Sequence, residues 1–280
     1  MLSHLPTRLQ PWETSACLLI VACLFPAVPA VPAAFAESVA SMDLPATGQS
    51  TVETTTRVEL DYLIHFPADY DPAGEQTYPL VIFLHGAGER GDDLNKIKKW
   101  GPPKFVAEQT LPAELQEAII VSPQCGKDQW WPSDTMLAAL DQMFDDLLAA
   151  HAVDPTRVYL TGVSMGGYGT WAWAGKHPKR FAAIAPICGG GSFFNARTIA
   201  NAKLPVWCFH GDQDNIVPLS ESLAMMQTLY QIGHKGNHAR LTVFPNTTHN
   251  SWTPAYATEE LWSWMFSHQR QDTPETEAKP

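Results

Sequence analysis

Ser164 is the residue whose surroundings point most directly to chemistry. It stands between Gly162 and Gly166 in a Gly-x-Ser-x-Gly pattern, after the apolar run 157–161 and before the helix-like segment 168–177. A serine on a sharp turn between a strand and a helix needs small neighbours, because the chain folds closely on itself there. The helix behind it would aim free N–H groups at the serine oxygen. The pattern therefore predicts a nucleophilic serine.

A histidine late in the chain is the predicted base for this serine. A serine hydroxyl needs a base within hydrogen-bonding distance, and chains with this serine turn order their groups as serine, acid, histidine. His249 follows the last apolar run, residues 241–244, and precedes the last helix-like segment, residues 258–268. His234 and His238 lie before that run, at its opposite end. We therefore predict that His249 is the base.

The acid that orients this base should follow the apolar run 205–209, where two aspartates compete. Asp212 comes directly after a glycine and could cap the turn through its own backbone, which is common for Asp in loops. Asp214 lies further along and could reach the loop that carries His249. The acid would accept the Nδ1–H of the imidazole and stabilise the imidazolium. The residues by themselves leave both aspartates open.

Two backbone N–H groups are needed to hold the oxyanion of a tetrahedral intermediate. One is predicted to be that of Met165, directly after the serine, and the other to come from a loop after an early strand. Residues 85–91 form a glycine-rich loop after the apolar run 79–84, and we assign the second donor to Ala87. This loop lacks the lysine of a phosphate-binding loop and the spacing of a dinucleotide site. No organic cofactor and no metal are expected.

Short apolar runs alternate with segments of helical spacing along most of the chain. Side chains from about residue 52 to residue 64 alternate between polar and apolar, which is the period of a half-buried antiparallel strand. Later runs, such as residues 118–121 and 181–185, are continuously apolar and indicate strands buried on both faces. This alternation predicts an α/β fold, with a mostly parallel central sheet, antiparallel N-terminal strands and helices on both faces. Ligands bind at the carboxyl ends of such strands.

The first 36 residues are predicted to be a signal peptide. Arg8 precedes the apolar stretch 16–28, and Ala34-Phe35-Ala36 has the form of a cleavage site. Prolines interrupt a run shorter than the roughly 20 residues of a membrane span, so no stable span is expected. The alternative is a lipoprotein cleaved at Cys23. Secretion, to the outside or to the periplasm, is favoured because the apolar run before Cys23 is short.

The rest of the chain is predicted to form one catalytic domain at residues 51–270. Residues 37–50 are polar and rich in Ser and Thr, and we expect a flexible mature N-terminus there. Residues 271–280 are polar without an apolar period, which predicts a disordered tail. The formal net charge of −11, without a large basic cluster, argues against nucleic acid as a partner.

Three cysteines follow the predicted cleavage site, and none has the close spacing of a metal or redox motif. They are Cys125, Cys188 and Cys208. Cys188 and Cys208 each end an apolar run and read as small buried hydrophobes. A disulfide could join them if their strands are neighbours.

Four motifs together resemble a family of secreted α/β-hydrolase esterases. They are HGAGERG at 85–91, GVSMGGYGTW at 162–171, HGDQDNIVP at 210–218 and the late histidine followed by Ser-Trp. Similar patterns occur in feruloyl and acetylxylan esterases, polyhydroxybutyrate depolymerases, dienelactone hydrolase and predicted peptidases. The resemblance covers roughly residues 50 to 270 and implies an α/β-hydrolase fold. In that family the aspartate of HGxxDxxVP is the triad acid, so the resemblance selects Asp214.

Tryptophans near the predicted site are candidates for substrate binding. Trp130 and Trp131 follow a strand end, and Trp252 lies close to His249 in the sequence. Such rings suit sugars or aromatic acyl groups, and core or rim packing is the alternative. No long insertion separates the serine turn from the acid turn, so we expect an open site for short acyl chains or polymer-attached esters.

The sequence thus predicts a secreted carboxylic-ester hydrolase that works through an acyl-enzyme. Its partner would be a small-molecule or polysaccharide-linked ester. A serine peptidase or an acyltransferase on the same fold is one alternative. A catalytically silent carbohydrate-binding protein is another, and the presence of both a nucleophile and a base argues against it.

Overall fold

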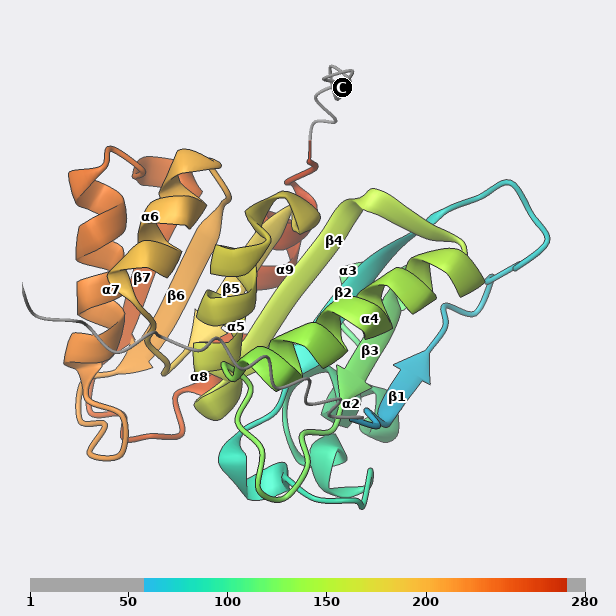
Figure 1. The fold of residues 1–280 in the computed structure, drawn as a ribbon, viewed down its shortest axis with the longest axis horizontal. Coiled ribbons are helices and arrows are strands. Elements are labelled where there is room, and N and C mark those ends of the chain that lie inside the picture. The colour runs from blue at the N-terminus through green and yellow to red at the C-terminus, as the bar shows by residue number, and fades with distance from the viewer. Residues whose placement is uncertain (1–57, 271–280) are drawn as a thin grey trace, which may run out of the picture. The chain divides into compact units, whose positions relative to one another are not determined.

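The computed structural model describes residues 58–270 of the 280-residue chain (Figure 1). The predicted signal peptide at 1–36, the mature N-terminus at 37–50 and the tail at 271–280 lie outside the described residues. Within the described part, no helix combines the length and apolar character that crossing a membrane requires.

One seven-stranded sheet forms the centre of this part of the chain. Its strands are β1 (Tyr62–His65), β2 (Tyr78–Leu84), β3 (Ile119–Pro123), β4 (Val153–Val163), β5 (Ala183–Ile187), β6 (Val206–Gly211) and β7 (Ala239–Phe244). Their order across the sheet is β1-β3-β2-β4-β5-β6-β7. β1 pairs antiparallel with β3, and every other neighbouring pair is parallel. The predicted mostly parallel sheet with an antiparallel N-terminal edge is confirmed.

Strand β2 shows why the central runs are continuously apolar. Leu80, Ile82 and Leu84 belong to the hydrophobic core on one face of the sheet. Val81 and Phe83 belong to the core on the other face. All five are fully buried. A strand covered on both sides has no position left for a polar side chain.

Helices cover both faces of the sheet (Figure 1). The core of one face takes buried residues from α4 (Asp134–Ala150), α5 (Met165–Lys176), α6 (Phe193–Asn201) and α7 (Leu219–Gln231). The core of the other face includes side chains of α2 (Gly101–Glu108), α3 (Ala113–Gln116), α8 (Trp252–Tyr256) and α9 (Glu260–Phe266). The segment predicted as one helix over 258–268 forms only the shorter α9.

The three cysteines of the described part are buried and free. Strands β5 and β6 are neighbours, as a bridge between Cys188 and Cys208 would require. The two thiols are nevertheless not joined.

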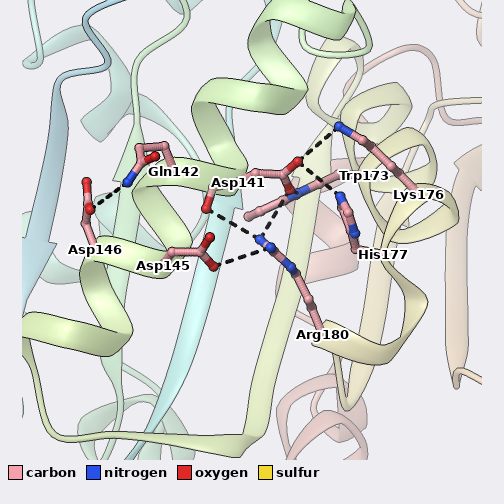
Figure 2. Close-up of polar contacts among 8 residues, drawn as sticks. All are labelled: Asp141, Gln142, Asp145, Asp146, Trp173, Lys176, His177 and Arg180. Carbon is pink, nitrogen blue, oxygen red and sulfur yellow. Dashed lines mark hydrogen bonds and ion pairs between the residues drawn. The ribbon is translucent and has the colours of Figure 1, made fainter. Parts of the chain in front are cut away.

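An ion network joins α4 to the C-terminal end of α5 and the turn beyond it (Figure 2). The carboxylate of Asp141 accepts hydrogen bonds from Trp173 Nε1 at 2.8 Å, Lys176 Nζ at 3.0 Å and Arg180 at 3.2 Å. His177 Nε2 lies 3.0 Å from the same carboxylate. Burial by itself raises the pKa of Asp141, but the donors from Trp173 and Lys176 and the nearby positive charges outweigh it and hold the pKa below its ordinary value of 3.8. Asp141 thus stabilises the packing of two helices.

We expect Asp141→Asn to lower the free energy of unfolding at neutral pH by about 1–2 kcal/mol, because charge-assisted hydrogen bonds are lost. The folded state lowers the pKa, so the carboxylate's contribution is complete above about pH 4 and disappears as the pH falls through the folded pKa. Urea denaturation from pH 7 to pH 3 should show the wild type and variant converging. Asp145→Asn, which changes a more exposed aspartate of the same helix, should stay within about 0.5 kcal/mol.

Candidate active site

Ser164 occupies a strained turn between β4 and α5. Its backbone has φ 55° and ψ −115°, a region that non-glycine residues rarely adopt. A Cβ atom at Gly162 would collide with Gly166 O, and one at Gly166 would collide with Leu84 O. The two glycines of the motif are therefore required by the close approach of strand and helix. Because of this turn, the serine side chain projects from the carboxyl end of the sheet.

Three loops bring Ser164, His249 and Asp214 into one hydrogen-bonded row. His249 Nε2 lies 2.9 Å from Ser164 Oγ, and His249 Nδ1 lies 2.7 Å from Asp214 Oδ2. An ionised carboxylate only accepts, so Nδ1 carries the proton and Nε2 is left to accept the serine O–H. This tautomer is the one a general base needs.

The side chain of Asp214 is fully buried, and its carboxylate accepts several hydrogen bonds. Its Oδ1 accepts the backbone N–H groups of Ile216 and Val217, both at 2.9 Å. Burial alone raises the pKa of Asp214, but the hydrogen bonds from His249 and these N–H groups hold it below its ordinary value of 3.8. His210 Nε2 also lies near this carboxylate, at 3.4 Å from Asp214 Oδ2. The site therefore keeps this carboxylate ionised out of water.

Asp212, the competing aspartate, has a different position. Its Oδ1 accepts the backbone N–H of Thr247 at 3.2 Å. It is exposed and contacts the loop that carries His249, not the imidazole itself. Asp212 helps to hold two loops together.

Two backbone N–H groups border the serine. Met165 is the first residue of α5, so its N–H has no acceptor within the helix. Ala87 begins the short 3₁₀ segment η1 (Ala87–Glu89), which leaves its N–H in the same condition. This loop lies beside the nucleophile, because a Cβ on Gly86 would stand 3.8 Å from Ser164 Cβ.

His85 fixes the loop that carries Ala87, and sequence reasoning gave it no role. The ring is almost fully buried, with Nδ1 at 2.6 Å from Gly86 O and Nε2 accepting the Cys125 N–H at 2.9 Å. These partners are satisfied by the neutral ring with its proton on Nδ1. Burial lowers the pKa of His85 to about 4. The sequence signals were its place at the end of an apolar strand and at the start of the HGAGERG motif.

The three tryptophans predicted to bind substrate have different environments. Trp131 is fully buried and donates from Nε1 to His85 O at 3.0 Å, so it supports the loop and does not wall an open pocket. Trp252 packs edge-on against His249, with ring centroids 5.3 Å apart. Trp130 is 43% exposed and its ring lies 5.6 Å from that of Tyr168. Trp130 is thus the one of the three that offers a broad open face.

An open groove of about 730 Å³ extends from this aromatic pair. Its lining includes Trp130, Asp134, Tyr168, Lys176, Gly190 and Asn195. Tyr168 lies one helical turn beyond Ser164, and its N–H donates to Ser164 O at 3.0 Å. The groove therefore begins close to the nucleophile and combines aromatic faces with charged and amide groups.

Comparisons with known proteins agree with this architecture. The sequence profile described as "Dienelactone hydrolase family" matches residues 116–268. A solved thermostable esterase is 32% identical, with a TM-score of 0.68, over 78% of this chain and 61% of its own. The esterase PE8 is 22% identical with a TM-score of 0.53, over 71% of this chain and 97% of its own, which supports the fold alone.

Curated relatives match shorter parts. Poly(3-hydroxyalkanoate) depolymerase C of Paucimonas lemoignei is 46% identical over 52 residues, which are 19% of this chain and 13% of that protein. A probable feruloyl esterase C of Aspergillus terreus is 25% identical over 178 residues, 61% of each chain. The chain thus spans less than two thirds of the length of these relatives. The family profile covers more than half of this chain, and the protein therefore belongs to the dienelactone hydrolase family and has the α/β-hydrolase fold.

Proposed function

We propose that the protein is a carboxylic-ester hydrolase with Ser164 as nucleophile, His249 as base and Asp214 as the acid that orients the base. The row of hydrogen bonds from Asp214 through His249 to Ser164 carries this proposal. The names of the relatives favour esters as substrates, since a solved structure and several curated relatives are called esterases.

The reaction would proceed in two halves. Ser164 Oγ attacks the ester carbonyl while His249 Nε2 takes its proton, and the N–H groups of Met165 and Ala87 hold the oxyanion. The intermediate collapses, the His249 proton passes to the leaving alcohol, and an acyl-enzyme remains. Water then repeats the sequence, with His249 again as base, and releases the acid and the free serine. Asp214 stabilises the imidazolium in both halves.

The groove at Trp130 supports esters attached to a sugar or another ring as substrates. A flat aromatic face next to carboxylate and amide groups binds a ring through stacking and hydrogen bonds together. A serine peptidase or an acyltransferase would use the same three groups. Residues 51–270 would form the catalytic domain, and residues 1–36, outside the described part, would direct export.

The first test is covalent labelling. A fluorophosphonate probe should label the wild type, and Ser164→Ala should abolish labelling because the attacking oxygen is gone. Ser164→Ala and His249→Ala should each lower kcat on aryl esters by about four to six orders of magnitude. Wild-type protein that is folded but neither labelled nor active would favour the silent binding protein.

The two aspartates give a matched comparison. Asp214→Asn should lower kcat by about 10³–10⁴-fold, because the amide no longer holds the imidazole in the required tautomer. Asp212→Asn should cost less than about tenfold, since only an exposed hydrogen bond changes. Steady-state kinetics on one aryl acetate would decide, and equal losses would contradict the assignment of Asp214.

Substrates of different length test whether the groove at Trp130 binds the substrate. Trp130→Ala should raise KM for feruloylated or acetylated oligosaccharides about threefold to tenfold, the loss of one aromatic contact. It should leave kcat/KM for 4-nitrophenyl acetate nearly unchanged, because a short ester does not reach the groove. Trp130→Phe should restore part of the oligosaccharide KM. An equal effect on both substrates would instead indicate a displaced loop.

A further inference from the structure

Cys188 stands directly after β5, against the row of Asp214, His249 and Ser164, and has no role in ester hydrolysis. Its backbone has φ 39°, the left-handed region that costs a non-glycine residue roughly 1–2 kcal/mol. Its N–H donates to Phe209 O at 2.8 Å, and the residue is fully buried. The fold thus holds a thiol beside the candidate triad at some cost in backbone strain.

The thiol completes a set of metal-binding groups. One donor atom each from Cys188, Asp214 and His249 lie within 4.8 Å of one another, the one such group found within residues 58–270. Thiolate, imidazole and carboxylate are the three protein ligand types of Zn²⁺. Ligand atoms of a tetrahedral zinc site lie roughly 3.3–3.6 Å apart, given its bond lengths. A contraction of about 1 Å would close the group around an ion.

Ser251 supplies an independent observation. Its hydroxyl is fully buried. Its polar neighbour is the Cys188 sulfur, to which the hydroxyl can donate a hydrogen bond. A neutral thiol is a weak acceptor, whereas a metal-bound thiolate accepts a hydrogen bond well. An ion at this place would therefore strengthen the hydrogen bond of the buried hydroxyl.

We propose that Cys188, Asp214 and His249 form an inhibitory site for a thiophilic divalent cation such as Zn²⁺ or Cd²⁺. On binding, the Cys188 S–H bond breaks, its proton passes to solvent, and the sulfur electron pair forms the metal bond. The neutral imidazole binds through the lone pair of one nitrogen and carries its proton on the other. The Asp214 carboxylate contributes one oxygen, and water fills the remaining position.

An ion bound to either nitrogen of the His249 imidazole would inhibit ester hydrolysis. His249 uses Nδ1 to contact Asp214 and Nε2 to accept from Ser164. A metal on Nδ1 removes the link to the carboxylate and places a cation next to the base. A metal on Nε2 occupies the lone pair that would take the serine proton. Either way the ion and turnover exclude one another.

Burial determines how fast the ion can enter. The side chain of Asp214 is fully buried and that of His249 is 21% exposed. An ion therefore enters only when the imidazole swings aside, and inhibition should develop over time and not at mixing. Chelation should reverse it, because the thiolate takes a proton back from solvent when the ion leaves.

The activity test uses aryl acetate hydrolysis after incubation with Zn²⁺ or Cd²⁺. The wild type should lose activity slowly and recover it with EDTA. Cys188→Ser and Cys188→Gly should keep their basal activity and raise the half-inhibitory concentration at least about tenfold, because the softest ligand is gone. Glycine also suits the positive φ at this position. Cys208→Ser, which changes a second buried cysteine outside the donor group, should remain as sensitive as the wild type.

Inhibition can be measured only if the protein hydrolyses esters, so that test rests on the proposed function. Metal binding can be measured without this activity, and a second experiment therefore tests the metal site by itself. Ser164→Ala retains all three ligands and should still bind one Cd²⁺, seen as a thiolate-to-cadmium absorption band in the ultraviolet. The double variant with Cys188→Ser should lack the band. Absence of the band in Ser164→Ala, or undiminished inhibition of both Cys188 variants, would overturn the metal site. Binding without any esterase activity in the wild type would overturn the proposed function alone.

Discussion

The carboxylate of Asp214 has to remain ionised where water does not reach it, and much of the site follows from that requirement. Two N–H groups of its own turn and the imidazole of His249 replace the lost hydration. The imidazole can donate only if the turn after β6 and the loop after β7 lie side by side. The contact from Asp212 to Thr247 joins these same segments. The row that reaches Ser164 is thus a consequence of satisfying one buried charge.

Two residues with strained backbones lie at the carboxyl ends of neighbouring central strands. Ser164 and Cys188 both have positive φ, and they follow the neighbouring parallel strands β4 and β5. Such conformations persist only where surrounding packing determines them. Here the Ser164 N–H donates to Ile187 O and the Cys188 N–H to Phe209 O, so each strained residue is held by the next strand. The sheet itself imposes the geometry that places a hydroxyl and a thiol near one imidazole.

Local sequence patterns predicted the secondary-structure elements whose residues are marked by their burial. The apolar run 79–84 matches β2 almost residue for residue, because burial on both faces marks each position. Helix α2 was not predicted, since Gly-Pro-Pro at its start reads as a break although proline fits a first helical turn. The burial of Trp131 depends on His85, 46 positions away, which no local pattern reveals.

Helix α5 links the stability of the fold to the proposed chemistry. Its first residue, Met165, supplies a candidate oxyanion donor, while Trp173 and Lys176 near its other end bind Asp141 of α4. The helix is about 18 Å long and rigid along its axis, so fixing the far end restricts how the near end can tilt. An oxyanion donor is effective only within a few tenths of an ångström of its position. The ion network around Asp141 therefore contributes to positioning at Ser164 without touching it, and Lys176 at the same time forms part of the groove wall.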